Sequence, residues 1–385
     1  MTYYLLPKTN HPFSIKITIQ NEPITTYTSH SLFFFYYKIT EQFIHLFTPS
    51  PIKNIQTSSN HEYSTEFFKD MKNKVFSEPI DQDTLNYFKM ESISKIFHPY
   101  EFLFSNVFVS KLQNQKENFY DFYEIIKTVY LFENFHKKNI MILTITPNPE
   151  SIQECIEFLR DGLKDEISSF ESYTYFFKEE EKEEEKEEKT FDFIFYELDK
   201  EKYRNDNEYI IGLIQIVIII LKTQKQGSSC MIKIDSIFLK PILDIIYLLT
   251  SLYEKTYIMK PSVSNIVTFE KYLICKNFTD DSLSFSQRDV YYEKLVYYLK
   301  KFQEYRAKKM VYISSIIESS LPCYFISKIN DINIIIGQQQ LEAIQQMIVF
   351  FKNKNKEKMN QMTKMHIYKS VKWCEKFKIP HHNVL

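Results

Sequence analysis

The segment from Gly227 to Phe278 limits the fold more than any other part of this 385-residue chain. It opens with a short apolar run, Cys230 to Ile234, which is typical of a buried strand. A helical pattern follows, with five apolar residues on one face: Ile242, Ile245, Ile246, Leu249 and Leu252. A second strand-like run, Tyr272 to Cys275, closes the segment. This succession of strand, helix and strand predicts a parallel α/β architecture.

Two charged residues stand at unusual places in this segment. Lys233 lies inside the first apolar run, and Glu270 comes just before the second. Lysine and glutamate are rarely buried in a sheet unless they are paired. We therefore expect the two side chains to face each other or a cleft.

The glycine content restricts the kind of cofactor site that the chain can build. Only four glycines occur, and none lies within ten residues of another: Gly162, Gly212, Gly227 and Gly337. Glycine-rich cofactor loops need glycines close together, so that the backbone can approach the ligand. No such loop is recognisable here.

Charge and cysteine content indicate the class of protein. The formal net charge is -1, so any RNA-binding surface must be local. Five cysteines without a C-x-x-C pair indicate a reducing compartment and no metal site. The longest apolar run, Tyr209 to Leu221, has thirteen residues and fits a buried helix better than a membrane span. We expect a soluble, cytoplasmic protein that does not bind membranes.

The order of motifs in the central segment resembles a known family. Gly227 precedes the strand with Lys233, Lys260-Pro261 leads into a loop with Ser262 and Ser264, and Glu270 opens the run E-K-Y-L-I-C-K-N-F. This pattern is similar to the second half of the FtsJ-type RNA ribose 2′-O-methyltransferases, which include viral and cellular mRNA cap methyltransferases. The resemblance implies a Rossmann-like methyltransferase sheet with helices on both faces, and S-adenosylmethionine as the cofactor.

The resemblance also implies a catalytic tetrad. In the family, a lysine takes the proton of the ribose hydroxyl or stabilises the alkoxide, and Lys233 matches that lysine. Glu270 matches the family glutamate, and Glu197 stands where a catalytic aspartate is usual. Asp121 stands where the family has a second lysine. A plain amphipathic helix is the alternative interpretation of the segment around Asp121.

The cofactor loop departs from the family pattern. A strand is predicted from Asn139 to Thr146, and the family follows it with A-P-G-G. Pro147 matches the proline, whereas Asn148 and Pro149 replace the glycines. The resemblance implies that Thr146, Pro147, Asn148 and also Asp192, which opens a strand pattern like "D-L-V-x-x-D", bind the cofactor. Ser151 and Glu154 predict a capping box for the next helix.

The remaining patterns divide the chain into three regions. We expect an N-terminal accessory region at 1–95, a methyltransferase domain at 96–280 with an acidic low-complexity loop at 178–189, and a C-terminal helical region at 281–385. The strands and helices expected outside the central segment are: strands Phe13 to Ile19, Tyr173 to Phe177 and Phe191 to Tyr196, and helices Lys111 to Phe132, Asn205 to Lys222, Arg288 to Glu318, Leu341 to Phe351 and Lys356 to Phe377.

A basic stretch near the C-terminus suggests a partner. From Phe351 to Lys378 there are nine lysines and two glutamates, with Tyr368 and Trp373 among them. Lysines and aromatic rings on one face can bind RNA through phosphates and stacking. The alternative is a helix that packs its apolar side and leaves its lysines in solvent. A protein partner on the C-terminal helices is a further expectation.

Three interpretations of function remain open. The first is a degenerate methyltransferase homologue that acts as an RNA-binding or partner-binding subunit, since three carboxylates would raise the pKa of Lys233 and the glycine loop is lost. The second is an active S-adenosylmethionine-dependent cap 2′-O-methyltransferase. The third is an unrelated α/β protein with a chance match. The frequent Ile, Asn, Lys, Phe and Tyr suggest an AT-rich genome, which with the resemblance fits a large DNA virus acting in the host cytoplasm.

Overall fold

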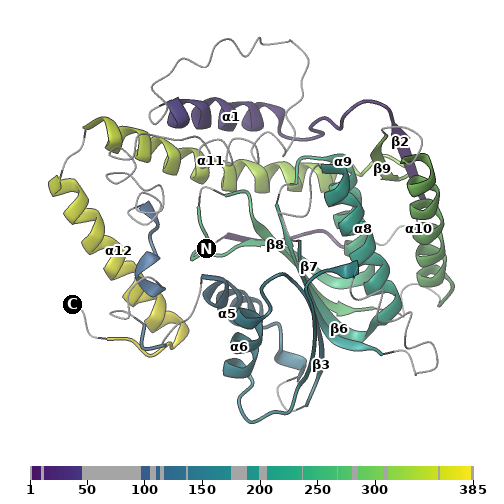
Figure 1. The fold of residues 1–385 in the computed structure, drawn as a ribbon, viewed down its shortest axis with the longest axis horizontal. Helices are drawn as coiled ribbons and strands as arrows, with labels where there is room; N and C mark the ends of the chain where they lie inside the picture. Colours follow the sequence, from purple (N-terminus) through teal and green to yellow (C-terminus); the bar gives the residue numbers. More distant parts are fainter. Residues whose placement is uncertain are drawn as a thin grey trace.

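A seven-stranded mixed sheet forms the centre of the computed structural model (Figure 1). Its strand order is β1-β7-β8-β6-β5-β3-β4, and helices cover both faces. This arrangement confirms the predicted Rossmann-like α/β fold. The structure describes residues 2–9, 13–45, 97–104, 110–112, 117–135, 138–174, 189–198, 206–235, 237–266, 268–279, 285–306, 311–353 and 356–382.

The parallel part of the sheet has a Rossmann-like winding. Its strands are β3 (Met141–Ile145), β4 (Glu166–Phe170), β5 (Phe191–Glu197) and β6 (Gln224–Ile234). After β3 the chain passes through α6 (Glu150–Leu159) to β4 on one side of β3 and then returns to form β5 on the other side. The strand order therefore reverses between β3 and β5, which makes this the topological switch point of the sheet.

The other part of the sheet corrects one prediction. α9 (Lys240–Leu252) leads into β7 (Tyr253–Lys260), a strand that the sequence pattern did not indicate. The expected strand is β8 (Lys271–Phe278), but it lies between β6 and β7 and is antiparallel to both. The parallel direction expected for it is wrong because only ten residues, 261–270, connect β7 to β8. A parallel connection needs a dozen residues or more, so the chain turns back.

Strands from both ends of the chain join this core. β1 (Thr2–Leu5) pairs with β7, while β2 (Ile15–Gln20) pairs with β9 (Tyr312–Ile317) in a second, two-stranded sheet. The helix expected through Glu318 is α10 (Phe285–Arg306), and it ends before β9. The domain boundaries stay predictions, although these pairings cross both of them.

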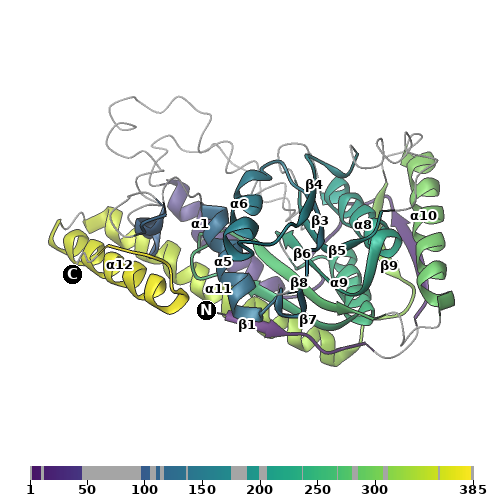
Figure 2. The same cartoon turned by 90° about the horizontal axis from the view of Figure 1, so that it is seen from below.

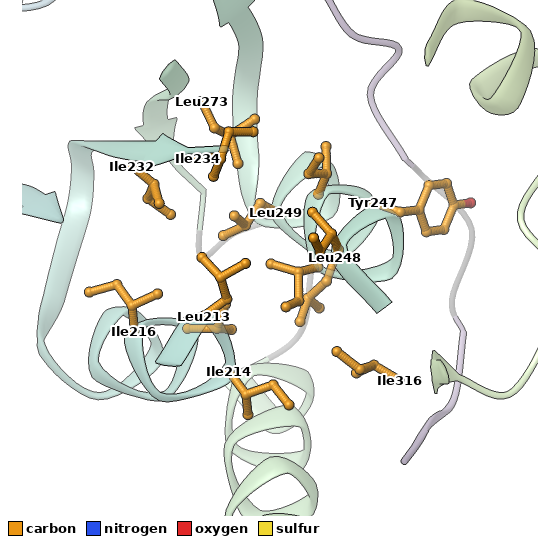
Figure 3. Close-up of a cluster of buried hydrophobic side chains, with 14 of the residues drawn as sticks. Leu213, Ile214, Ile216, Ile232, Ile234, Tyr247, Leu248, Leu249, Leu273 and Ile316 are labelled. Atoms are coloured by element: carbon orange, nitrogen blue, oxygen red, sulfur yellow. The ribbon is translucent and has the colours of Figure 1, made fainter. Parts of the chain in front are cut away.

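Alternation along the strands decides which face each side chain occupies. Cys230, Ile232 and Ile234 of β6 pack against α9 and α8 (Asp206–Thr223), as the close-up in Figure 3 shows for the two isoleucines. Met231 belongs to the core on the opposite face, which is covered by α6 and α5 (Glu117–Val129). The same alternation puts Lys233 on the α5 face. Figure 2 shows the two helical layers on either side of the strands.

The remaining helices lie around the sheet. They are α1 (His30–His45), α11 (Cys323–Asn353) and α12 (Lys356–Phe377), with the short 3₁₀ turns Glu101–Leu103 and Glu133–Phe135. α1 lies along α11 (Figure 1), so closely that a Cβ on Gly337 would stand 2.6 Å from Leu32 Cδ2. The helices expected at 341–351 and 356–377 are confirmed, and the first of them is longer than expected.

Some local expectations are wrong or fall elsewhere. The strand expected at Tyr173 to Phe177 is wrong at its start, because residues 173–174 are helical and the strand is β4. The acidic loop, except Lys189, and residues 46–95 of the accessory region lie outside the described residues. Across the part of the chain that the structure describes, no helix is both long and apolar enough to cross a membrane. In that same part, His, Cys, Asp and Glu side chains form no group suited to a metal ion.

Candidate functional site

The topological switch point places the candidate site at the carboxyl ends of β3 and β5, where ligands bind in open α/β sheets. Thr146 follows directly after β3, and Glu197 is the last residue of β5. Thr146 Oγ1 donates a hydrogen bond of 2.9 Å to Glu197 Oε2. The parallel pairing of the two strands brings these side chains to one edge.

Lys233 joins this pair from the next strand. It stands opposite Glu197 in the β5–β6 ladder, and its Nζ lies 2.7 Å from Glu197 Oε1. Glu270 comes just before β8, and its Oε2 lies 3.5 Å from the same Nζ. The structure therefore brings Lys233, Glu197 and Glu270 together, as expected for the first and last of them. Their catalytic roles stay a prediction.

Asp121 reaches the group from α5 through a tyrosine that the sequence interpretation missed. Tyr272 donates from its hydroxyl to Asp121 Oδ2 at 3.0 Å, and its ring centroid lies 5.9 Å from Lys233 Nζ. Burial raises the pKa of Tyr272 well above its ordinary value, and Asp121 and Glu197 raise it further, so the hydroxyl stays protonated and donates. The signal in the sequence was the alternation from Glu270, which puts Tyr272 on the same face.

The electrostatics of the group keep Lys233 charged. Burial alone would lower the pKa of Lys233, because it disfavours an ammonium ion. The attraction of Glu270 and Glu197, the hydrogen bond to Glu197 and the charge of Asp121 outweigh that effect and raise the pKa above its ordinary value. At neutral pH the side chain is an ammonium ion, which donates hydrogen bonds and cannot accept a proton.

The turn after β3 uses its own backbone donors. The N–H of Thr146 donates to Phe170 O at 2.9 Å, and the N–H of Asn148 donates to Thr146 Oγ1 at 3.2 Å. Pro147 and Pro149 have no N–H. Within this described turn, residues 146–149, every backbone donor is thus already used.

The helix that follows the turn begins without a side-chain cap. α6 begins at Glu150, and Pro149 at its N-cap makes no side-chain capping bond. The predicted capping box is wrong, because Ser151 lies inside the first helical turn and not at the cap. Thr146 and Asn148 thus use their N–H groups within the protein, and Pro147 has none. These three predicted cofactor residues do not fit a backbone cradle for S-adenosylmethionine.

Asp192 does not belong to this edge of the sheet. It lies at the amino end of β5, where its Oδ2 accepts from the N–H of Met141 at 2.9 Å and from Lys225 Nζ at 3.0 Å. Glu197 lies five positions further along the extended strand, which is a distance of roughly 16 Å. The structure thus separates Asp192 from the other predicted cofactor residues and gives it a structural partner.

One further acidic residue lies at the correct edge. Glu171 follows directly after β4, the strand beside β3, and its side chain is exposed. In Rossmann-type sheets an acidic residue at this position binds ribose hydroxyls. The sequence interpretation missed Glu171 because it placed the second strand at Tyr173 and beyond.

Similarity to known proteins is found among solved structures. No family model matches the sequence, and no curated protein matches it. Among solved structures, a protein described as a ribosomal RNA methyltransferase from Plasmodium falciparum is similar, with 18% sequence identity and a TM-score of 0.33. The similarity covers 43% of this chain and 98% of that protein.

Proposed function

We propose that this chain is a degenerate homologue of the FtsJ-type RNA ribose 2′-O-methyltransferases that binds RNA or a protein partner without transferring methyl groups. The observation that carries the proposal is the turn at residues 146–149. Two of its residues are prolines, and the N–H groups of Thr146 and Asn148 both donate within the protein. A methyl donor would find no backbone donor there.

The state of Lys233 supports the same proposal. A general base must be unprotonated to take the proton of a ribose hydroxyl, and its pKa must lie near the working pH. Two carboxylates within ion-pair distance and a third on α5 raise the pKa of Lys233 instead. Asp121, which stands where the family has a second lysine, also raises the pKa of Lys233.

Calorimetric titration with S-adenosylmethionine and with its demethylated product tests the proposal. We expect no heat of binding at millimolar ligand for the wild-type protein. The double variant Asn148→Gly/Pro149→Gly supplies an N–H at position 149 and lets the backbone approach the ligand closely. Weak binding of S-adenosylmethionine should therefore appear. Asn148→Gly alone restores no donor and serves as the control. Micromolar binding by the wild-type protein would overturn the proposal.

A second candidate function is an active cap 2′-O-methyltransferase in the cytoplasm of a host cell. The observation that favours it is the contact of Lys233 with both Glu197 and Glu270 at the carboxyl edge of the sheet. Glu171 could hold the ribose of the cofactor there. The test is transfer of a labelled methyl group to capped RNA, which Lys233→Ala should abolish. Absence of transfer by the wild-type protein would exclude this candidate.

A further inference from the structure

Helix α12 carries a local positive charge that the rest of the chain does not share. From Lys356 to Phe377 it contains six lysines and two glutamates, whereas the whole chain has a formal net charge of -1. The candidate site has the opposite character, with Glu197, Glu270 and Asp121 around one ammonium ion. Phosphate groups are therefore repelled by the candidate site and attracted by α12.

One face of α12 is buried against the body of the protein. His366, Ser370, Trp373 and Phe377 repeat at helical spacing and are all buried. Trp373 Nε1 donates to Glu124 Oε2 of α5 at 2.8 Å. Trp373 was a candidate stacking residue in the sequence interpretation. Its burial rules that role out and makes it the anchor of the helix.

The opposite face forms an exposed ridge. Lys364, Tyr368 and Lys372 are spaced four residues apart, which places each about 6 Å from the next along one side of the helix. Tyr368 is 48% exposed, and Lys372 Nζ lies 5.7 Å from its ring centroid. Lys358 and Lys376 are also exposed. In both views α12 lies at a margin of the molecule (Figure 1; Figure 2).

We propose that this ridge, Lys364, Tyr368 and Lys372 with the flanking Lys358 and Lys376, binds single-stranded RNA. The lysines neutralise successive phosphates, and the ring of Tyr368 stacks on an unpaired base. Stacking on an aromatic ring needs a base that is not held in a duplex, and it tolerates any base. The proposal rests on the RNA-binding role proposed above and locates that role on α12.

Fluorescence anisotropy with a labelled 20-nucleotide oligouridylate tests the ridge. Binding should weaken steeply with salt, and log K should fall by about 0.7 per phosphate contact for each unit of log salt concentration. Lys364→Gln and Lys372→Gln should each reduce that slope by about 0.7. Tyr368→Ala should weaken binding at least about fivefold, because one stacked base contributes about 1 kcal/mol or more. Tyr368→Phe should bind like the wild type.

α10 offers a matched control. Lys301 Nζ lies 4.5 Å from the ring centroid of Tyr297, so the same pair of residue types stands four residues apart on an exposed helix face. That helix has mixed charge, with five basic and three acidic residues from Phe285 to Arg306. Tyr297→Ala and Lys301→Gln should leave RNA binding unchanged. A duplex RNA of equal length should bind more weakly than the single strand.

Three results would overturn the proposal that the ridge binds RNA. They are absence of binding at low salt, α12 variants that bind like the wild type, and an equal loss from the α10 variants. Emission of Trp373, the single tryptophan, checks that α12 stays docked in every variant. The outcome is separable from the methyl-donor titration. If the wild-type protein binds S-adenosylmethionine and Tyr368→Ala weakens RNA binding, the proposal of a degenerate methyltransferase would be refuted. RNA binding by the ridge would still be supported.

Discussion

Lys233 and Glu197 face each other across two neighbouring parallel strands, with 2.7 Å between Nζ and Oε1. Their side chains are only 10% and 12% exposed. Glu270 and Asp121 act on the same ammonium ion, so this one lysine offsets the charge of carboxylates from three separate segments of the chain. We expect this contact to act as a structural brace.

Replacing this lysine should destabilise the fold. Lys233→Met leaves a buried carboxylate cluster without its cation, so the free energy of unfolding should fall by about 3–5 kcal/mol at pH 7. Urea unfolding of the wild type and of the variant at pH 7 measures the loss. The control is Lys16→Met, which removes a fully exposed pair with Glu318 and should change nothing measurable. A loss below about 1 kcal/mol for Lys233→Met would contradict the brace.

Glu124 should be required for docking of α12. Its buried carboxylate accepts from the N–H of Ser262 at 2.8 Å, from Ser262 Oγ and from Trp373 Nε1 at 2.8 Å. Glu124→Ala removes these acceptors, and unfolding should become easier by about 2–5 kcal/mol, since each buried donor left unpaired costs about 1–3 kcal/mol. The emission of Trp373 should shift to longer wavelength. Glu124→Gln keeps one acceptor oxygen and should shift it less, and an unchanged spectrum in Glu124→Ala would show that the contact does not hold the helix.

Two buried histidines should make the free energy of unfolding decrease as the pH falls. Burial is the main cause that lowers the pKa of His98 to about 4. A backbone hydrogen bond with Val263 opposes this effect, and the charges of His366 and Lys260 add to it. Burial, helped by Lys369, lowers the pKa of His366 to about 4 as well. Both are neutral in the folded state, while the unfolded chain takes up protons near pH 6.5. The stability is therefore complete above pH 6.5 and is lost as the pH falls towards 4.

Urea unfolding at pH 7.5 and pH 4.5 measures this effect. Each histidine should account for about 2–3 kcal/mol of the loss, at about 1.4 kcal/mol per pKa unit. Buried carboxylates contribute to acid unfolding too, so the comparison is with His98→Gln, which cannot be protonated. The variant should lose less stability than the wild type over the same interval, and an equal loss would contradict the prediction.

Asp244 should hold the second sheet to the core. Its fully buried Oδ2 accepts from Ser315 Oγ at 2.8 Å and from the N–H groups of Ile316 and Ile317 at 2.7 and 3.2 Å. Asp244→Ala should free these donors and lower the free energy of unfolding by about 3 kcal/mol or more. Amide hydrogen exchange of Ile316 should quicken more than that of Ile274 in the main sheet. If the variant raised the exchange rate by the same factor at both amides, Asp244 would not hold β9 and the strand would depend on β2 alone.

The sequence predicted the α/β class because its central strands are apolar on both faces, and buried parallel strands have that pattern. It missed β7, whose segment Y-E-K-T-Y-I-M-K mixes charged and apolar residues without a clear period. This strand depends on pairing with β8 and β1, which local sequence does not reveal. β9 was read as helix for a similar reason, because its partner β2 lies at the other end of the chain.

The candidate site shows the same division. Lys233 and Glu270 could be placed together from sequence, since one lies in and the other next to a predicted strand. Asp192 was grouped with residues at the opposite edge because the resemblance assigned it to the cofactor, although it opens its strand. The two prolines were visible from the start. The hydrogen bonds that use the N–H groups of Thr146 and Asn148 appear only in three dimensions.

The pairing of β1 with β7 has a consequence for how the protein is made. A ribosome adds about 5–20 residues per second, so β7 leaves it roughly 10 to 50 seconds after β1. β2 waits still longer, because its partner β9 follows later in the chain. Until β7 and β9 have been synthesised, β1 and β2 therefore remain without their partners, and an unpaired strand edge favours association with other chains. Nascent chains of this protein should depend on chaperones until the last third has been translated.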